Sequence, residues 1–245
     1  MTEQLVTRSG RRIAFDRVAG GGPDVLFLGG FRSDRQGTKA LALEAWARAQ
    51  GRAFLRFDYG GHGESSGNFE DLGIDDWLED AREVVRNLTE GPQVLVGSSM
   101  GGWLALLLAR EMPDLVAGLV TVAAAPDFTV DLEAGLSPAE RDALSAEGRV
   151  SRPSAYGPDP YVFTRALIGQ GRRHLVLASP LALPMPVRLL QGTADTDVPV
   201  ATALRLFDHA IGPDIRLTLV KGADHRFSTP DCLRQLVATV EEVGP

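Results

Sequence analysis

Short apolar segments alternate with longer amphipathic segments along most of this chain. Strand-like runs occur at residues 5–7, 12–15, 25–28, 54–57, 94–96, 119–122, 187–190 and 217–220. Strands that are apolar on both faces are typical of a parallel sheet buried between layers of helices. The pattern predicts an α/β fold with a mostly parallel, eight-stranded sheet, opened by a hairpin and covered by helices on both faces.

Two helices are defined clearly by the sequence. Apolar residues from Ile74 to Leu88 recur at the i, i+3, i+4, i+7 spacing, and acidic residues occupy the other face. Near the C-terminus, Ser228 and Thr229 precede Pro230, which is a typical start for a helix. The single cysteine, Cys232, falls in this last helix, where we expect a buried and unreactive thiol.

The alternation stops between residues 126 and 183. This segment is much longer than the usual connection of about 2 to 6 residues in α/β units. A capping box from Ser137 to Glu140 predicts one helix, and the apolar run 161–168 predicts a second. We therefore predict a core of residues 1–125 and 184–245, with a helical lid of residues 126–183 inserted after the sixth strand. The alternative is a helical excursion that touches no ligand.

A G-x-S-x-G pentapeptide, Gly97-Ser98-Ser99-Met100-Gly101, stands where a strand gives way to a helix. Small residues on both sides of Ser99 allow the backbone to reverse sharply, which places the hydroxyl above the sheet beside the first free N–H groups of the helix. This setting predicts that Ser99 is a nucleophile.

A serine hydroxyl needs a base, and the base needs an orienting acid. In this architecture the acid and the histidine follow the serine in chain order, on loops after later strands. Asp195 is the first carboxylate after the seventh strand and is the preferred acid, with Asp197 and Asp127 as alternatives. His225 follows the eighth strand and is the predicted base.

The other three histidines are not expected to act as the base. His62 lies in a glycine-rich turn, His174 in the insertion and His209 on a helix face. Acyl transfer also needs N–H donors for the developing oxyanion. We expect these donors to be the backbone N–H groups of Met100, directly after the nucleophile, and of Phe31, in the glycine loop after the third strand.

Other chemistries fit these residues less well. An aspartyl nucleophile would need a carboxylate at position 99. Asp195, Asp197 and Asp224 could be arranged around a metal, but no second histidine or paired-ligand spacing supports one, so we predict neither a metal nor a cofactor. The glycines of residues 60–63 form neither a dinucleotide fingerprint nor a phosphate-binding loop.

Composition limits the partners and the compartment. The net charge of -7 and the lack of a basic cluster argue against nucleic acid, and one cysteine excludes an internal disulfide and a cysteine-based zinc site. No segment reaches the roughly 18 consecutive apolar residues of a membrane span, so we predict no stable membrane insertion. The N-terminus shows no apolar leader, and we expect a cytoplasmic protein. No feature predicts an oligomeric state.

The turn that carries Ser99 (the nucleophile elbow), the loop with Asp195 and the loop with His225 follow one another along the chain. In this order the chain resembles the α/β-hydrolase superfamily over essentially its whole length. Residues 30–34, 37–40, 56–63, 77–80 and 97–103 resemble more narrowly the mitochondrial thioesterases and acyl-glucuronide esterases of the abhydrolase-domain family. The resemblance implies hydrolysis of acyl thioesters or acyl esters by Ser99, Asp195 and His225, on a small-molecule acyl ester or an acylated protein. The chain has no transit peptide, so the organellar address is not expected to carry over.

The insertion and the glycine loop are the expected substrate contacts. An acyl site and its surroundings are predicted at Phe163, Leu167, Ile168, Gly30 and Arg32. Arg32, Arg35 or Lys39 could meet an anionic head group, the alternative being a solvated surface role. Two other functions stay open: a carboxylesterase, lipase or carbon–carbon bond hydrolase of the same fold, and a non-catalytic ligand-binding protein.

Overall fold

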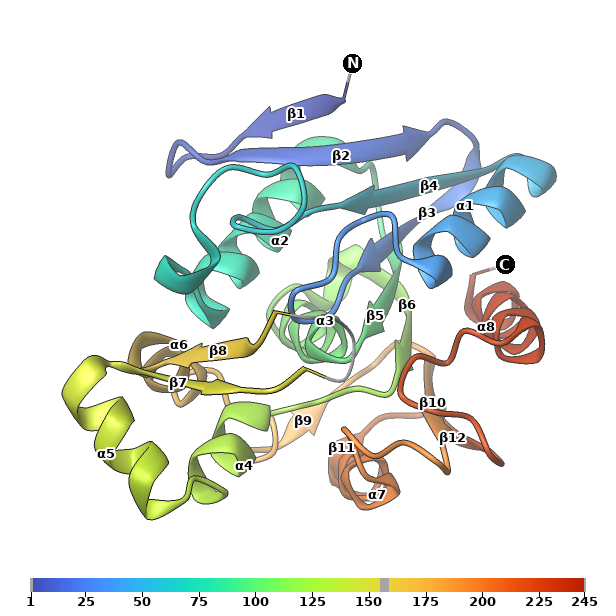
Figure 1. Cartoon of the computed structure of the whole chain (residues 1–245). Helices are drawn as coiled ribbons and strands as arrows, with labels where there is room; N and C mark the ends of the chain where they lie inside the picture. The colour runs from blue at the N-terminus through green and yellow to red at the C-terminus, as the bar shows by residue number, and fades with distance from the viewer. Residues whose placement is uncertain (1, 155–158, 245) are drawn as a thin grey trace.

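A computed structural model describes residues 2–154 and 159–244, and its centre is an eight-stranded sheet (Figure 1). The strands are β1 (Glu3–Val6), β2 (Arg12–Val18), β3 (Gly21–Leu28), β4 (Arg52–Phe57), β5 (Gln93–Ser98), β6 (Val116–Val122), β10 (Val187–Gly192) and β12 (Ile215–Val220). Their spatial order is β1-β2-β4-β3-β5-β6-β10-β12, with β2 antiparallel to both of its neighbours and every other pair parallel. The predicted sheet is confirmed.

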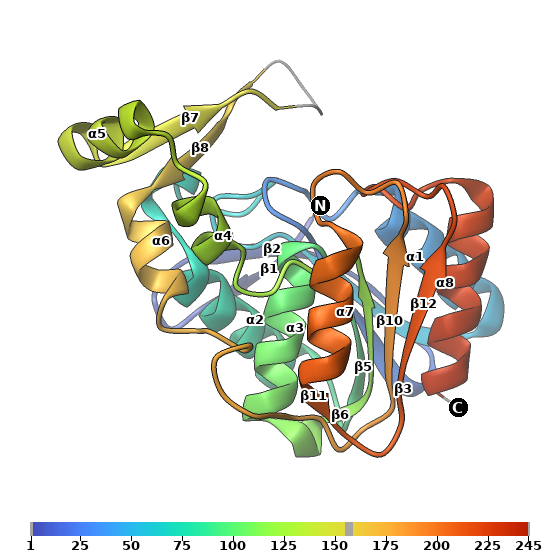
Figure 2. The ribbon, with the colours of Figure 1, turned by 90° about the horizontal axis from the view of Figure 1, so that it is seen from below.

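Helices cover both faces of this sheet, as predicted (Figure 2). One face carries α1 (Thr38–Gln50) and α8 (Pro230–Val243), and the other carries α2 (Ile74–Leu88), α3 (Met100–Glu111) and α7 (Val200–His209). Single-turn helices occur at Phe69–Asp71 and Pro113–Leu115. Buried apolar side chains form two clusters, one rich in α2 and α3 and one rich in α1 and α8. The core therefore lies on both sides of the strands, which holds the ends of β5, β10 and β12 in fixed positions.

The chain between β6 and β10 first extends beyond one end of the sheet and then returns along α3 to the start of β10 (Figure 2). It contains α4 (Phe128–Ala134), α5 (Pro138–Glu147), β7 (Arg149–Arg152), β8 (Tyr161–Thr164), α6 (Arg165–Gly171) and β9 (Leu181–Ala182). The predicted capping box is present at the start of α5, where Ser137 and Glu140 each accept the other's backbone N–H. Residues 155–158 of the predicted lid lie outside the described residues.

One element of the insertion differs from the prediction. Residues 161–164, predicted to begin a helix, form strand β8, which pairs antiparallel with β7. Tyr161, Val162 and Phe163 are aromatic or β-branched and suit a strand, and the Thr164 hydroxyl caps α6 by accepting the Leu167 N–H at 3.0 Å. The helix therefore begins at Arg165, and the insertion includes a hairpin. Its division from the core at residues 126 and 183 stays a prediction.

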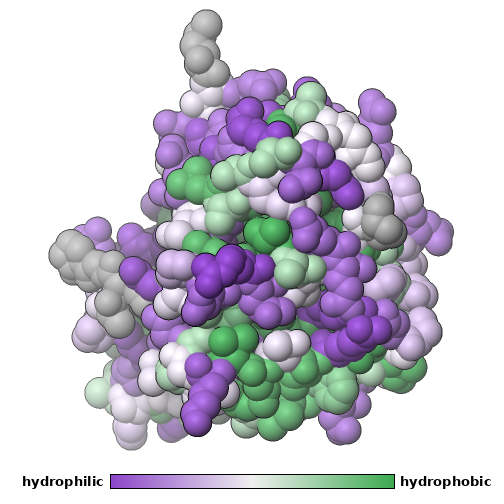
Figure 3. Space-filling model, turned by 90° about the vertical axis from the view of Figure 1, so that its right-hand side faces the viewer, coloured by the Kyte–Doolittle hydropathy of each residue, from purple (hydrophilic) through white to green (hydrophobic). Residues whose placement is uncertain are grey.

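Large apolar side chains are exposed near one edge of the sheet. They are Leu204 and Phe207 on α7, Ile211 on the short strand β11 (Ala210–Ile211) and Leu219 on β12. Figure 3 shows apolar surface on the lower part of this side of the molecule. Across the described parts of the chain, the helices are too short or too polar to span a lipid bilayer.

Candidate active site

Ser99 occupies a sharp turn between β5 and α3. Its φ of 55° and ψ of -118° are rarely adopted by a residue with a side chain, so the surroundings must enforce this conformation. Both glycines of the pentapeptide are required, because a side chain at either position would clash with neighbouring backbone atoms. A Cβ atom at Gly97 would overlap the carbonyl of Gly101, and one at Gly101 would overlap the carbonyl oxygens of Leu28 and Gly29. The predicted elbow therefore packs directly against the end of β3.

The structure brings Ser99, His225 and Asp195 together. His225 Nε2 lies 3.2 Å from Ser99 Oγ, and His225 Nδ1 lies 2.9 Å from Asp195 Oδ2. The three side chains follow β5, β12 and β10, whose carboxyl ends meet at one edge of the sheet. This arrangement can pass a proton from the hydroxyl to an imidazole that a carboxylate orients.

Asp195 is held by a dense set of donors. Its Oδ1 accepts the N–H groups of Asp197 and Val198 at 2.9 and 2.8 Å, and its Oδ2 accepts Gln191 Nε2 at 3.0 Å. Burial opposes ionisation of this fully buried carboxyl, but the hydrogen bonds from His225 and Val198 outweigh it, and the pKa of Asp195 is lowered. Gln191 was missed at the sequence level, although its place at the end of β10, just before the acid loop, was a usable signal.

The alternative acids have other contacts. Asp197 contributes its backbone N–H to Asp195. Both carboxylate oxygens of Asp127 accept backbone N–H groups, those of Val176 and Leu177, each at 2.9 Å. Burial raises the pKa of Asp127. Its side chain therefore ties the end of the insertion to the loop after β6.

The other histidines make structural contacts that do not involve Ser99. His174 Nε2 lies 2.6 Å from Asp75 Oδ1, and His209 Nε2 lies 2.7 Å from the carbonyl oxygen of Ser179. His62 is buried, with Nε2 3.2 Å from the Arg32 nitrogen and Nδ1 3.2 Å from the Gly60 oxygen.

The loop after β3 lies against the elbow. A Cβ atom at Gly30 would be 3.4 Å from both Ser99 Cβ and the Ser98 carbonyl oxygen, so Gly30 lies directly against the turn that carries the nucleophile. Within residues 2–154 and 159–244, neither the Phe31 N–H nor the Met100 N–H donates a hydrogen bond. Met100 opens α3, whose first N–H groups have no partner within the helix. Both predicted oxyanion donors therefore have no hydrogen-bond partner among the described residues.

The side chain of Phe31 joins this loop to the insertion. Its ring lies 4.9 to 5.9 Å from five other rings, those of Phe69, Trp77, Phe128, Tyr161 and Phe163. Phe163 stacks face to face on it, at 5.4 Å and 15°. Beside it, Arg32 Nη1 donates to the carbonyl of Pro160 at 2.8 Å, and the guanidinium lies 5.4 Å from the centre of the Phe69 ring.

The remaining predicted substrate contacts fall in different places. Leu167 and Ile168 are buried in α6, where the Leu167 backbone lies against Gly73, the residue that precedes α2. Arg35 is buried and ion-paired with three carboxylates, those of Asp16, Asp58 and Glu64. Lys39 Nζ donates to the Arg226 carbonyl oxygen at 2.6 Å. Of the three cationic residues considered for an anionic head group, Arg32 is the exposed one. It lies in the loop after β3, which adjoins Ser99.

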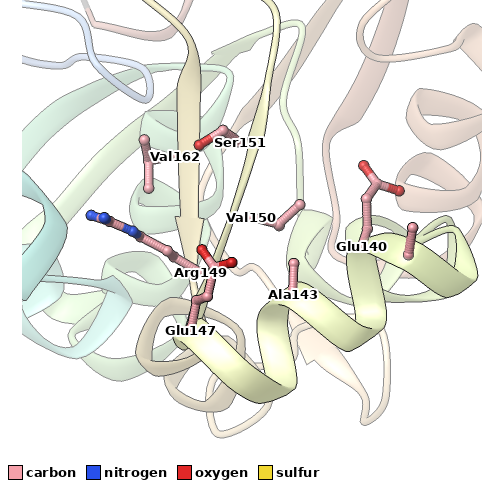
Figure 4. Close-up of a pocket in the computed structure, with 8 residues that line it drawn as sticks. Glu140, Ala143, Glu147, Arg149, Val150, Ser151 and Val162 are labelled. Atoms are coloured by element: carbon pink, nitrogen blue, oxygen red, sulfur yellow. The ribbon is translucent and has the colours of Figure 1, made fainter.

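A cavity of about 560 Å³ lies within the insertion, between α5 and the β7–β8 hairpin (Figure 4). Its lining residues are Ala139, Glu140, Ala143, Glu147, Arg149, Val150, Ser151 and Val162. None of these is among the predicted site residues.

The described residues contain one group of carboxylate and imidazole side chains close enough to share a cation. These are Asp195, Asp197 and His225, whose potential ligand atoms lie within 4.8 Å of one another. The Asp195 oxygens and His225 Nδ1 are already engaged in the hydrogen bonds described above. A cation at this point would have to displace them.

Comparison with known proteins places the chain in a family. Residues 25–239 match the alpha/beta hydrolase family. The chain belongs to this family. The α/β-hydrolase fold expected from the sequence is therefore confirmed.

Within the alpha/beta hydrolases, the chain is similar to the mitochondrial palmitoyl-protein thioesterase ABHD10. It is 35% identical to the Homo sapiens protein and 36% identical to the Bos taurus protein, over 94% of this chain and 76% of each relative. The mouse alpha/beta hydrolase domain-containing protein 10 superposes with a TM-score of 0.91 at 33% identity, covering 99% of this chain and 97% of that chain. A putative hydrolase from Agrobacterium vitis S4 gives 0.96 at 40% identity, covering 99% and 98%. The predicted resemblance is confirmed.

The predicted cytoplasmic location is wrong. The relatives that match 94% of the chain are named as mitochondrial proteins. The prediction rested on the missing apolar leader, but mitochondrial targeting segments are amphipathic and rich in arginine rather than apolar.

Proposed function

We propose that this chain is a serine hydrolase that cleaves acyl thioesters or acyl esters through an acyl-Ser99 intermediate. The observation that carries the proposal is the continuous hydrogen-bonded series from Ser99 Oγ through His225 to Asp195, with spacings of 3.2 and 2.9 Å. The thioester and ester substrates are supported by family membership and by relatives named as palmitoyl-protein thioesterases. The substrate is a small acyl ester or an acylated protein.

Acylation begins when Ser99 Oγ attacks the substrate carbonyl carbon and His225 Nε2 takes the hydroxyl proton. Asp195 holds the imidazole through Nδ1 and stabilises the imidazolium. The N–H groups of Phe31 and Met100 bind the oxyanion, and each such donor is worth about 2.7 to 4 kcal/mol in the transition state. The tetrahedral intermediate collapses as His225 gives its proton to the leaving thiolate or alkoxide.

Deacylation repeats these steps with water. His225 Nε2 takes a proton from a water molecule, which attacks the acyl carbonyl while the same two N–H groups hold the oxyanion. Collapse returns the proton to Ser99 Oγ and releases the carboxylic acid. The enzyme is restored without a cofactor.

The substrate meets the loop after β3 and the insertion. Gly30 lets the carbonyl approach Ser99, because no side chain stands there. Phe163 contacts the acyl chain from the insertion, and Leu167 and Ile168 support that wall from their buried positions in α6. Arg32 faces an anionic head group such as a glucuronate.

A fluorophosphonate probe tests the proposal, together with turnover of palmitoyl-CoA, p-nitrophenyl butyrate and an acyl glucuronide. We expect the native protein to be labelled, and Ser99→Ala to lose labelling and at least about a thousandfold in kcat. Ser98→Ala is the matched control, because it removes the neighbouring hydroxyl at the end of β5 and should leave both readouts intact.

Two results would contradict the assignment: no labelling of the native protein, or labelling that survives in Ser99→Ala. The first would favour a non-catalytic binding protein. The substrate panel separates a thioesterase from a general carboxylesterase, because only the former should turn over palmitoyl-CoA with a higher kcat/KM than the butyrate ester.

A further inference from the structure

We infer that His62 is a positioning residue for the loop of residues 29–32: it accepts the Arg32 N–H and thereby fixes the direction of the Phe31 N–H beside Ser99. The inference rests on the proposed function, because it concerns the donor that would hold the oxyanion. It assigns a role to a histidine that makes no contact with Ser99 or Asp195 and that proton transfer does not use.

The two ring contacts define the tautomer of His62. A backbone N–H only donates and a carbonyl oxygen only accepts, so Nε2 must be the bare nitrogen facing Arg32, and Nδ1 must carry the hydrogen facing Gly60. Burial also lowers the pKa of His62 to about 4, which keeps the ring neutral near pH 7. A protonated ring could not accept the Arg32 N–H.

The backbone at Arg32 needs this support. Arg32 has a φ of 56°, in the left-handed region that residues with side chains seldom occupy. Its nitrogen belongs to the Phe31–Arg32 peptide, which is the middle peptide of a turn closed by the Ser33 N–H, donating to the Gly30 carbonyl oxygen at 3.1 Å. That carbonyl is in the same peptide as the Phe31 N–H, so a change in this turn also reorients the Phe31 N–H. The preceding Gly30 lies against Ser99, which means that a small rotation here changes the donor geometry at the hydroxyl.

The imidazole is itself held rigidly. Its ring makes edge-to-face contacts with Phe69 at 5.0 Å, Trp77 at 5.2 Å and Tyr59 at 5.6 Å. Trp77 Nε1 donates to the same Gly60 carbonyl, at 3.0 Å, that His62 Nδ1 contacts. His62 therefore links the loop after β3 to the packed loop after β4, and its acceptor nitrogen has a fixed position.

Two variants separate this role from simple core packing. His62→Phe keeps a ring of similar shape but has no acceptor, whereas His62→Gln can offer an acceptor near the Nε2 position. With p-nitrophenyl butyrate, we expect His62→Phe to lower kcat about 30-fold, a fraction of the roughly 10²- to 10³-fold cost of losing an oxyanion donor, with KM within about threefold. His62→Gln should recover most of that kcat. A role in packing alone predicts the reverse order.

Nitrogen NMR of the native protein gives a test that does not depend on a variant folding. The His62 resonances should show a protonated Nδ1 and a bare Nε2 at pH 7. A protonated Nε2 would overturn the inference, as would a folded His62→Phe variant with the kcat of the native enzyme or a His62→Gln variant as slow as His62→Phe.

Ser99→Ala, measured in the same assay, separates this inference from the proposed function. Activity that survives in Ser99→Ala would remove the serine hydrolase and the His62 role together. An inactive Ser99→Ala variant combined with a fully active His62→Phe variant would remove only the role of His62.

Discussion

Gln191 and Asp195 share one hydrogen bond on the side of the acid that faces the histidine. Gln191 Nε2 donates to Asp195 Oδ2 at 3.0 Å, and this oxygen is the one that lies 2.9 Å from His225 Nδ1. The amide nitrogen also donates to the Val198 carbonyl at 2.9 Å. Gln191 is fully buried, so it fixes the carboxylate relative to the loop that carries it.

Replacing Gln191 with methionine should therefore weaken catalysis as well as stability. Met keeps the length of the side chain but has no donor, which leaves Asp195 Oδ2 and the Val198 carbonyl each short of one hydrogen bond. We expect kcat to fall about tenfold and the free energy of unfolding to fall by about 1 to 3 kcal/mol, measured by kinetics and urea titration. Gln170→Met is the control: it removes amide contacts between α6 and α2, and it should lower stability without changing kcat. An unchanged kcat in Gln191→Met would contradict the positioning role.

Asp195→Asn and Asp197→Asn should behave very differently. The first variant loses the carboxylate that accepts His225 Nδ1, and we expect kcat to fall about a thousandfold or more. The second keeps the backbone N–H that Asp197 gives to Asp195, so kcat should stay within about threefold of the native value. Steady-state kinetics of the purified variants decides between them. The reverse order would assign the acid to Asp197.

Much of this architecture follows from local sequence patterns. The buried strands are apolar runs that end at turn residues, and the elbow is defined by glycines that the packing at Gly97 and Gly101 demands. Asp195 and His225 could be located because parallel strands present their carboxyl ends at one edge, so loops distant in sequence become neighbours. The contact of His225 with Ser99, and that of Asp195 with His225, are consequences of topology.

The parts that sequence did not predict depend on partners from elsewhere in the chain. Residues 161–164 form a short apolar run that fits a helix or a strand, and pairing with Arg149–Arg152 decides for the strand. Arg35 was considered for an anionic ligand because an isolated arginine gives no sign of burial. Its ion pair with Asp58 joins two loops that are distant in sequence.

Phe163→Ala tests the contact between the insertion and the acyl chain. The variant loses a half-buried ring that stacks on Phe31, so long acyl chains should lose more apolar contact than short ones. We expect kcat/KM for a palmitoyl thioester to fall about 5- to 30-fold, which corresponds to about 1 to 2 kcal/mol, with little change for an acetyl thioester. Phe207→Ala, at an exposed position of α7, should leave the ratio of kcat/KM for the two thioesters unchanged. Equal losses on both substrates in Phe163→Ala would argue against an acyl contact.

Asp58→Asn should destabilise the loop after β3. The fully buried Asp58 carboxylate accepts the Arg35 backbone N–H at 2.6 Å and its guanidinium at 2.5 Å, and an amide cannot serve both donors as well. Breaking a buried ion pair is costly, and we expect the free energy of unfolding to fall by about 2 to 4 kcal/mol in urea titration. Asp34→Asn, exposed on the same loop, should cost less than about 1 kcal/mol. Equal losses in the two variants would contradict the importance of the buried pair.

Lys39 should make the free energy of unfolding increase with pH above neutral pH. Burial lowers the pKa of Lys39 to about 8, against 10.5 for an ordinary lysine, so between these values the unfolded chain binds more protons than the native protein. The free energy of unfolding must then increase with pH in this interval. The full shift corresponds to about 3 kcal/mol, and partial solvent exposure of the side chain reduces our expectation to about 1 to 2 kcal/mol.

Lys39→Met isolates this contribution, because all other titrating groups are common to both proteins. The stability of the native chain relative to Lys39→Met should increase by that amount between pH 7 and pH 10, measured by urea titration at each pH. Lys39→Met also loses the hydrogen bond that the ammonium donates to the Arg226 carbonyl oxygen. This loss changes the stability of the variant mainly at pH 7, where the ammonium is charged. At that pH the cost of desolvating the ammonium opposes the stability gained from the bond. A relative stability that stays constant, or that falls as the pH rises, would show that the Lys39 ammonium is as well solvated in the folded protein as in the unfolded chain.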